Sequence, residues 1–176
     1  GRQSLLSSLD RLQDGSTLRD QSYNMLLGNI ANAFDIKKED PKTMEEYGKG
    51  IGEQLLLARR LAENGTKFIT VQYGGWDMHS NISNALKSRV PPIDKALAAL
   101  INDIHNKGLN KDVMVVVTGE FGRTYKINGN AGRDHWPRLS PLMFACGDFE
   151  MGRAIGESTS KAEEPKSDAY SPLNVT

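Results

Sequence analysis

The run Val-Met-Val-Val-Val at residues 113–117 constrains the fold more than any other segment of the sequence. Its apolar residues are continuous rather than alternating with polar ones, a pattern typical of a strand buried on both faces. Such strands occur in parallel sheets, whose two faces are covered by other layers of the protein. The run therefore predicts an α/β fold.

Helical patterns precede and follow this run. From apolar periodicity and breakers, helices are expected over residues 5–12, to about residue 34, and over residues 41–47, 51–63 and 91–107. Asp40 followed by Pro41 is a typical helix start. The pair Pro91 and Pro92 is expected to open the last helix, and Gly108 to end it. The apolar stripe of that helix should lie on the sheet.

Further strands are expected over residues 67–73, 141–145 and, as a short fourth strand, 153–158. Strands that alternate with helices predict βαβ units with right-handed crossovers. The chain is expected to form a single domain over residues 1–176. Residues 1–64 would be mainly helical, residues 65–158 would form the sheet and the site, and residues 158–170 an irregular loop.

The charge balance excludes several classes of partner. Lys plus Arg and Asp plus Glu both number 22, without a block of like charges, so no nucleic acid or anionic membrane is expected as a partner.

Cys146 is the single cysteine and is expected to be a buried, unreactive thiol. No transmembrane segment or signal peptide is visible, so either the protein is cytosolic or the chain lacks its true N-terminus.

The segment after the first expected strand carries Asp77 and His79. In open α/β sheets, ligands collect beyond the carboxyl ends of the strands. An Asp and a His two residues apart on an extended chain project to the same side, where they can bind one cation. Alternatively, Asp77 caps a turn and His79 packs nearby.

The strand at residues 113–117 leads into a second polar segment that carries Glu120 and Arg123. Glu120 would stand at the strand tip as a hard oxygen ligand, and its flanking glycines leave room for a bound molecule. Arg123 offers a planar fork that suits phosphate or sulfate oxygens. Alternatively, Glu120 and Arg123 form a structural ion pair.

A glycine-rich loop over residues 128–132 then delivers Asp134 and His135. Adjacent residues of an extended chain face different ways, so one can bind a metal while the other orients a ligand. The clustering of two of three histidines with acidic residues near strand ends predicts a functional polar site. His105 is expected on the surface near a helix C-terminus.

Two tryptophans adjoin these residues, and several well-known site motifs do not occur. Trp76 and Trp136 either line the wall of a pocket or only pack against neighbouring side chains.

There is no Gly-x-Ser-x-Gly elbow, no phosphate-loop lysine motif and no Gly-x-Gly-x-x-Gly fingerprint. Their absence argues against a serine esterase, a P-loop NTPase and a dinucleotide enzyme.

Several linked motifs between about residues 34 and 158 resemble one bacterial family, domain of unknown function 1501, which is abundant in planctomycetes. They are Tyr47-Gly48, Leu57-Ala58-Arg59-Arg60-Leu61, Gly75-Trp76-Asp77-Met78-His79, Gly119-Glu120-Phe121-Gly122-Arg123-Thr124 and Gly132-Arg133-Asp134-His135-Trp136-Pro137. The family is assigned to the alkaline-phosphatase and sulfatase superfamily. The resemblance implies a three-layer α/β/α sandwich with a largely parallel sheet.

The resemblance also implies metal ligands from loops at strand ends, in the order Asp with His, an acidic residue, then His. Asp77 with His79, Glu120 and His135 match that order, and Asp134 would be a further ligand or would orient one. Better-known superfamily members have an adjacent Asp-His pair at the middle position, where this chain has Glu120-Phe121. One nitrogen ligand is therefore missing, which puts a two-zinc site in doubt.

Family members usually carry an export signal and an early strand that ends in a Gly-Gly-Pro-Ser-His-type segment, and this chain has no such segment. The superfamily's nucleophile and first metal-binding Asp come from such early loops. The chain is therefore expected to be a fragment of a longer protein or a truncated gene prediction, and to be inactive alone. The resemblance implies an exported, periplasmic or extracellular bacterial protein.

Together these observations predict that the intact protein is a metal-dependent hydrolase of phosphate or sulfate esters. Mixed Asp, Glu and His ligands suit zinc or manganese best and calcium or magnesium less well. Arg123 would hold the anionic group of a small ester or a sulfated glycan. Two alternatives stay open: a non-catalytic exported protein that binds a sulfated or phosphorylated glycan, and polar networks that only brace loops.

Overall fold

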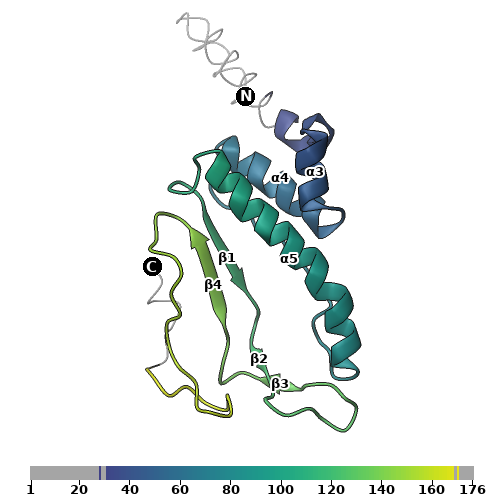
Figure 1. The fold of residues 1–176 in the computed structure, drawn as a ribbon, viewed down its shortest axis with the longest axis vertical. Coiled ribbons are helices and arrows are strands. Elements are labelled where there is room, and N and C mark those ends of the chain that lie inside the picture. Colours follow the sequence, from purple (N-terminus) through teal and green to yellow (C-terminus); the bar gives the residue numbers. More distant parts are fainter. Residues whose placement is uncertain (1–27, 29–30, 169, 171–176) are drawn as a thin grey trace, which may run out of the picture.

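The computed structural model describes residue 28, residues 31–168 and residue 170 (Figure 1). The helices expected over residues 5–12 and to about residue 34 lie mostly outside this range, although residues 31–34 are helical. The elements in chain order are η1 (Ile36–Lys38), α3 (Pro41–Tyr47), α4 (Ile51–Glu63), α5 (Ile82–Asn106), β1 (Met114–Thr118), β2 (Gly122–Arg123), β3 (His135–Trp136) and β4 (Leu142–Cys146). Within the described range, no helix is long and apolar enough to cross a membrane.

Helices α3 and α4 begin and end where the sequence predicts. Pro41 lies in the first turn of α3, where its missing N–H removes no intrahelical bond. Gly48 ends the helix with a φ of 77°, a conformation that suits glycine. At the start of α4 the backbone N–H of Gly50 donates to the Glu53 carboxylate over 3.1 Å, and this bond stabilises the first turn.

Helix α5 begins at Ile82, so the expectation that Pro91 and Pro92 open it is wrong. Both prolines lie inside the helix, where they remove two backbone N–H groups. They sit on its exposed side, so water can satisfy the freed carbonyls. The opposite face buries Ala96, Leu100 and Ile104 in the core.

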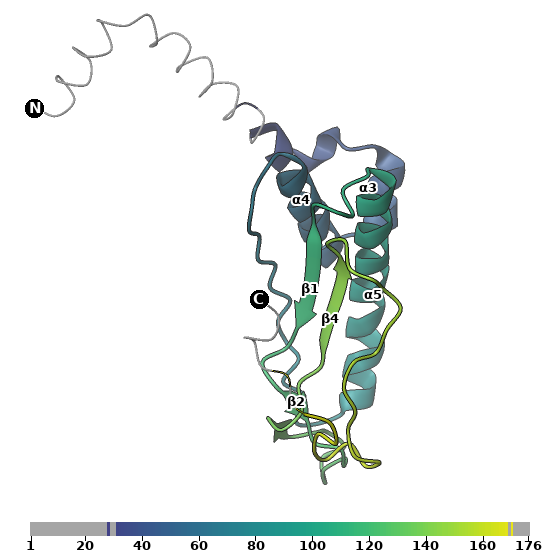
Figure 2. The same ribbon diagram turned by 90° about the vertical axis from the view of Figure 1, so that its left-hand side faces the viewer.

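Strand β1 pairs with β4 in an antiparallel ladder, with Val116 opposite Phe144. Helix α5 lies along one face of this pair (Figure 2), and its buried residues share a core cluster with Ala145. The expectation that residues 113–117 are buried on both faces is wrong. Met114 and Val116 are 47% and 44% exposed, because no described helix covers the other face.

Strands β2 and β3 form a second antiparallel pair, which lies near the N-terminal end of α5 (Figure 1). The described sheets are thus two-stranded and antiparallel, unlike the expected βαβ arrangement. Strand β4 lies where the strand over residues 141–145 is expected. The largely parallel sheet of an α/β/α sandwich remains a prediction from the resemblance.

The strand expected over residues 67–73 does not form in the described structure. No backbone hydrogen bond pairs this segment with another described one, although every second residue from 69 to 73 is half-buried. Val71 and Tyr73 pack against the core, whereas Phe68 is 86% exposed. The segment has the extended pattern of a strand but lacks a partner. The fourth strand over 153–158 is also absent, apart from one bridge between Ser158 and Pro165.

A buried ionic network joins α4 to its neighbours. Arg59 is only 2% exposed, and its guanidinium pairs with Glu39, with Glu63 at 2.6 Å and with Asp103 at 2.7 Å. Burial opposes its charge, but these carboxylates raise the pKa of Arg59 above its ordinary value. The Tyr47 hydroxyl also donates to Asp103 over 3.0 Å. The network therefore ties α3, α4 and α5 together.

Cys146 lies buried at the end of β4, as expected of a structural thiol. Burial raises the pKa of this thiol, which disfavours the reactive thiolate. Residues 158–168 form no helix or strand, as the sequence predicts for this tail.

Candidate metal centre

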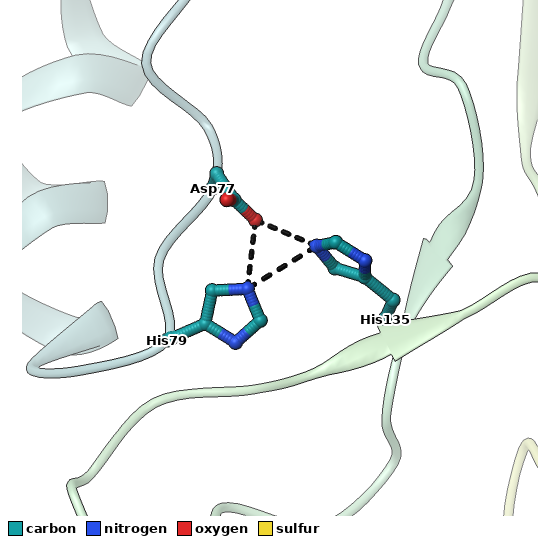
Figure 3. A group of neighbouring side chains, drawn as sticks. All are labelled: Asp77, His79 and His135. Carbon is teal, nitrogen blue, oxygen red and sulfur yellow. Dashed lines mark hydrogen bonds and ion pairs between the residues drawn. The ribbon is translucent and has the colours of Figure 1, made fainter.

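Asp77, His79 and His135 point toward one another at the end of the molecule that carries β2 and β3 (Figure 3). Asp77 and His79 come from the loop that precedes α5, and His135 is the first residue of β3. One ligand atom from each residue lies within 4.8 Å of the other two. The structure therefore brings together three of the five metal ligands that the sequence predicts.

A single carboxylate oxygen forms the corner of this group. Oδ1 of Asp77 lies 3.0 Å from Nε2 of His79 and 2.8 Å from Nε2 of His135. The two imidazole nitrogens are 3.2 Å apart. These side chains are 66%, 46% and 48% exposed respectively, so water and small ions reach the group freely.

The local structure fixes these side chains from two directions. In the β2–β3 pair, Arg123 stands directly opposite His135, so the two side chains share one face. The N–H of Thr124 donates to the carbonyl of Asp134, which extends the pairing by one residue. On the other side, the guanidinium of Arg123 donates to the carbonyl of Trp76 over 3.1 Å and so holds the loop that carries Asp77.

Asp134 does not enter the group but supports it. Its Oδ1 lies 2.7 Å from Nδ1 of His79, on the side of the ring away from Asp77. A carboxylate at this position holds the proton on Nδ1 and leaves the lone pair of Nε2 toward the centre of the group. Hydrogen bonds from His79 and then Asn128 lower the pKa of Asp134. This arrangement matches the orienting role that the sequence offers for Asp134.

Arg123 pairs with Asp77 rather than with Glu120. Its Nη2 lies 2.6 Å from Oδ1 of Asp77, and its Nη1 donates to the carbonyl of Arg133 over 3.2 Å. The hydrogen bond to His135, followed by that from Arg123, lowers the pKa of Asp77 to about 2. Asp77 is therefore ionised throughout the neutral range.

Glu120 lies outside the group, in contrast to its expected place as a ligand. Its side chain is exposed and makes no hydrogen bond or ion pair with any described residue. The next residue, Phe121, contacts the group instead, with its ring centroid 4.4 Å from that of His135. The backbone bends at residues 120–121, so the side-chain directions there do not follow the alternation of a strand.

The remaining candidates lie away from the group. His105 is exposed near the C-terminal end of α5, as expected. Trp76 packs edge-on against Tyr73 and donates to its carbonyl over 2.7 Å. Trp136 lines a separate open hollow of about 300 Å³, together with Tyr125 and Arg138. Successive residues of a strand face opposite ways, which separates Trp136 from His135.

The sequence patterns also miss one residue of the site. Asn128, in the glycine-rich loop, donates to the carboxylate of Asp134 over 3.1 Å and to the carbonyl of His79 over 3.0 Å. Its only signal in the sequence is an Asn at the start of a Gly-rich turn, six residues before Asp134.

The donor set fits a zinc-type ion. Catalytic zinc sites commonly have three protein ligands, drawn from imidazole nitrogens and carboxylate oxygens, and keep one position open. Ligand atoms about 2.05 Å from a tetrahedral ion lie about 3.3 Å apart, and the three observed separations are 2.8, 3.0 and 3.2 Å. Small movements of these exposed side chains would therefore accommodate the ion.

Comparison with known proteins finds one family. A family model described as "Protein of unknown function (DUF1501)" matches residues 7–176, a range that includes every residue of the group. No curated protein and no solved structure matches the chain.

Proposed function

The chain belongs to the DUF1501 family of proteins of unknown function, and from this premise we propose that it holds a divalent metal ion at Asp77, His79 and His135. We propose further that the protein is exported and is an alkaline-phosphatase-like hydrolase of phosphate or sulfate esters. The observation that carries this proposal is the convergence of two imidazole nitrogens and one carboxylate oxygen from distant parts of the chain.

The chain's own residues have distinct roles in this proposal. Asp77 supplies a negative charge that survives to low pH, because His135 and Arg123 hold its pKa low. Asp134 favours the tautomer of His79 with the proton on Nδ1, so that Nε2 would be free to bind an ion. A bound ion would act as a Lewis acid on the ester and raise the acidity of bound water.

Arg123 is the residue proposed to recognise the anionic group of the substrate. Its guanidinium is held by two backbone carbonyls and lies beside Asp77. A guanidinium has five N–H donors; three are used in these bonds, so two remain for phosphate or sulfate oxygens. An anion next to Arg123 would lie at the edge of the metal site, within reach of both positive charges.

A second candidate function is the binding of a sulfated or phosphorylated glycan without turnover. Two observations favour it. Glu120 stands outside the group, and no described hydroxyl or thiol side chain hydrogen-bonds to Asp77, His79 or His135. In this reading the ion and Arg123 would together hold the anionic group of the ligand.

Metal titration of the full-length protein tests the proposal. Isothermal calorimetry with Zn²⁺ and Mn²⁺ should show binding that falls at least about a hundredfold in His135→Ala and His79→Ala, since each removes one of few ligands. His105→Ala, an exposed histidine on α5, is the matched control and should bind as the unaltered protein does. Equal affinity in all four proteins would refute the site.

Turnover separates the two functions. The full-length protein is incubated with zinc or manganese and with 4-nitrophenyl phosphate or 4-nitrophenyl sulfate. Hydrolysis that is lost in His135→Ala supports the hydrolase. Metal and phosphate binding without turnover favours the non-catalytic reading.

A further inference from the structure

The loop that carries Asn128 is attached to the loop that carries His79 by a short set of backbone hydrogen bonds. The N–H of Arg133 donates to the carbonyl of Met78 over 3.1 Å, and the N–H of Ile82 donates to Ala131 over 2.9 Å. These bonds flank an isolated antiparallel bridge between Ser80 and Ala131. Main-chain hydrogen bonds therefore join the two loops directly.

The side chain of Asn128 completes this attachment with four hydrogen bonds. Its oxygen accepts from the N–H groups of Asn130 and Gly132 over 3.0 and 2.9 Å. Its nitrogen donates to the carbonyl of His79 and to Oδ1 of Asp134 over 3.0 and 3.1 Å. A primary amide has two donors and two acceptor positions, so every one is used.

The orientation of this amide is dictated by its partners. Both groups at its oxygen are N–H donors, and both groups at its nitrogen are acceptors. If the amide were flipped, its NH₂ group would face two N–H donors and its oxygen would face a carbonyl and a carboxylate, so all four hydrogen bonds would be lost. Neither aspartate nor alanine can reproduce this pattern, because neither side chain donates from an amide nitrogen.

The geometry links Asn128 to the chemistry of His79. Oδ1 of Asp134 hydrogen-bonds both to Nδ1 of His79 and to the amide nitrogen of Asn128. The Asn128 amide therefore holds the carboxylate in place, and the carboxylate in turn orients the imidazole of His79. The same amide holds the main chain of His79. One side chain therefore contributes to both the position of His79 and the direction of its ring.

We infer that Asn128 is a positioning residue for the metal site, which sets the affinity and geometry of the ion through Asp134 and His79 without touching the ion. This inference rests on the proposed function, because it presupposes an ion at His79. Loss of such supporting hydrogen bonds typically lowers metal affinity about 10- to 100-fold. A residue that only braced the loop would change stability and leave metal affinity unaltered.

Two substitutions in the full-length protein test the inference. Asn128→Ala removes all four bonds. Asn128→Asp keeps the two bonds within the loop, loses both donations, and sets a second negative charge beside Asp134. Asn130→Ala is the matched control, since the described contacts of Asn130 are made by its backbone.

Two readouts are measured for each variant: Zn²⁺ affinity by calorimetry, and the visible absorption of Co²⁺ in place of zinc, which reports coordination geometry. We expect Asn128→Ala and Asn128→Asp to lose 10- to 100-fold in affinity and to shift the Co²⁺ spectrum, with Asn130→Ala unchanged within about twofold. Circular dichroism checks that the variants fold.

The outcomes separate the inference from the function. Zinc binding by the unaltered protein with equal affinity in both Asn128 variants would overturn the positioning role and leave the proposed function standing. Failure of both variants to fold would assign Asn128 a structural role and overturn the inference too. An unaltered protein that binds no zinc would overturn both.

Discussion

The guanidinium of Arg123 donates to the same oxygen of Asp77 that faces both imidazoles, at 2.6 Å. A carboxylate oxygen has two lone pairs, and here three partners approach Oδ1. Arg123 therefore occupies one of the directions from which a metal ion would bind Asp77. It supplies the positive charge that the group of ligands otherwise lacks.

Arg123→Gln should raise metal affinity and weaken anion binding. Removing the positive charge frees Asp77 and ends the repulsion of a cation, and this gain should outweigh the loss of the hydrogen bond to the carbonyl of Trp76. Zn²⁺ should therefore bind about threefold more tightly or better. Inorganic phosphate should bind the zinc-loaded protein at least about tenfold more weakly, because its charged donors are lost. Calorimetry measures both affinities. Arg133→Gln, a nearby arginine whose backbone carbonyl accepts from Arg123, is the control.

Glu120→Gln should leave Zn²⁺ affinity within about twofold, whereas Asp77→Asn should lower it at least about tenfold. Of these two acidic residues, only Asp77 has a carboxylate oxygen among the converging ligand atoms. The same calorimetric titration compares the two variants. A loss in Glu120→Gln as large as that in Asp77→Asn would restore Glu120 as a ligand, as the sequence motif predicts.

Helices α3 and α4 could be predicted from the sequence because their signals are local. Asp40 and Pro41 start one helix, and the bounds of the other follow from flanking glycine and asparagine. The start of α5 could not be predicted, since Pro91 and Pro92 mark a helix start in isolation. Only the packing of the whole helix reveals that their freed carbonyls face water.

The strand expected at residues 67–73 does not form, because pairing depends on a partner strand, which the composition of the segment does not reveal. The convergence of Asp77, His79 and His135 could be predicted from their clustering near expected strand ends. The sequence pattern does not show that Glu120 lies apart from these residues, because it does not reveal the bend at residues 120–121 that redirects the chain. Asn128 could not be identified, because its four hydrogen bonds exist only once two distant loops meet.

Glu39 should make stability depend on pH in a defined direction. Burial raises the pKa of Glu39, but hydrogen bonds from Arg60 and Arg59 outweigh it, so the folded-state pKa lies below the ordinary value of 4.5. Its stabilisation is therefore complete above pH 4.5 and is lost as the pH falls through the lower, folded-state pKa.

Glu39→Gln should lower the free energy of unfolding by about 2 kcal/mol at pH 7, as expected for a hydrogen bond to a charged group. The difference from the unaltered protein should shrink below pH 4.5. Urea unfolding at several pH values measures it, with Glu46→Gln, exposed on α3, as the control. A difference that stays constant with pH would contradict this account.

Arg59→Ala should destabilise the fold by about 3–5 kcal/mol, because it leaves partly buried carboxylates without their cation. Tyr47→Phe removes one hydrogen bond to Asp103 and should cost about 1 kcal/mol. Arg153→Ala, in an exposed pair with Glu150, should cost less than about 1 kcal/mol. Thermal and urea unfolding rank the three variants, and a similar cost for Arg59 and Arg153 would show that burial of the network adds nothing.

Gly132→Ala should weaken metal binding, whereas Gly129→Ala in the same loop should not. A Cβ at position 132 would overlap the carbonyl of His79 and push the two loops apart, while nothing lies within 4 Å of a Cβ at position 129. We expect at least about a tenfold loss of Zn²⁺ affinity for Gly132→Ala. Equal affinities in calorimetry would mean that the contact between the loops has no influence on the site.

Asp77 and His135 are 58 residues apart in the chain, so their meeting depends on the folded state. An ion held between them binds the folded chain and has little affinity for the unfolded one, whose ligands are dispersed. By mass action, free ion at a hundred times its dissociation constant would add about 2.7 kcal/mol to the stability. The melting temperature would then rise with ion concentration, and a chelator would lower it to that of the metal-free chain.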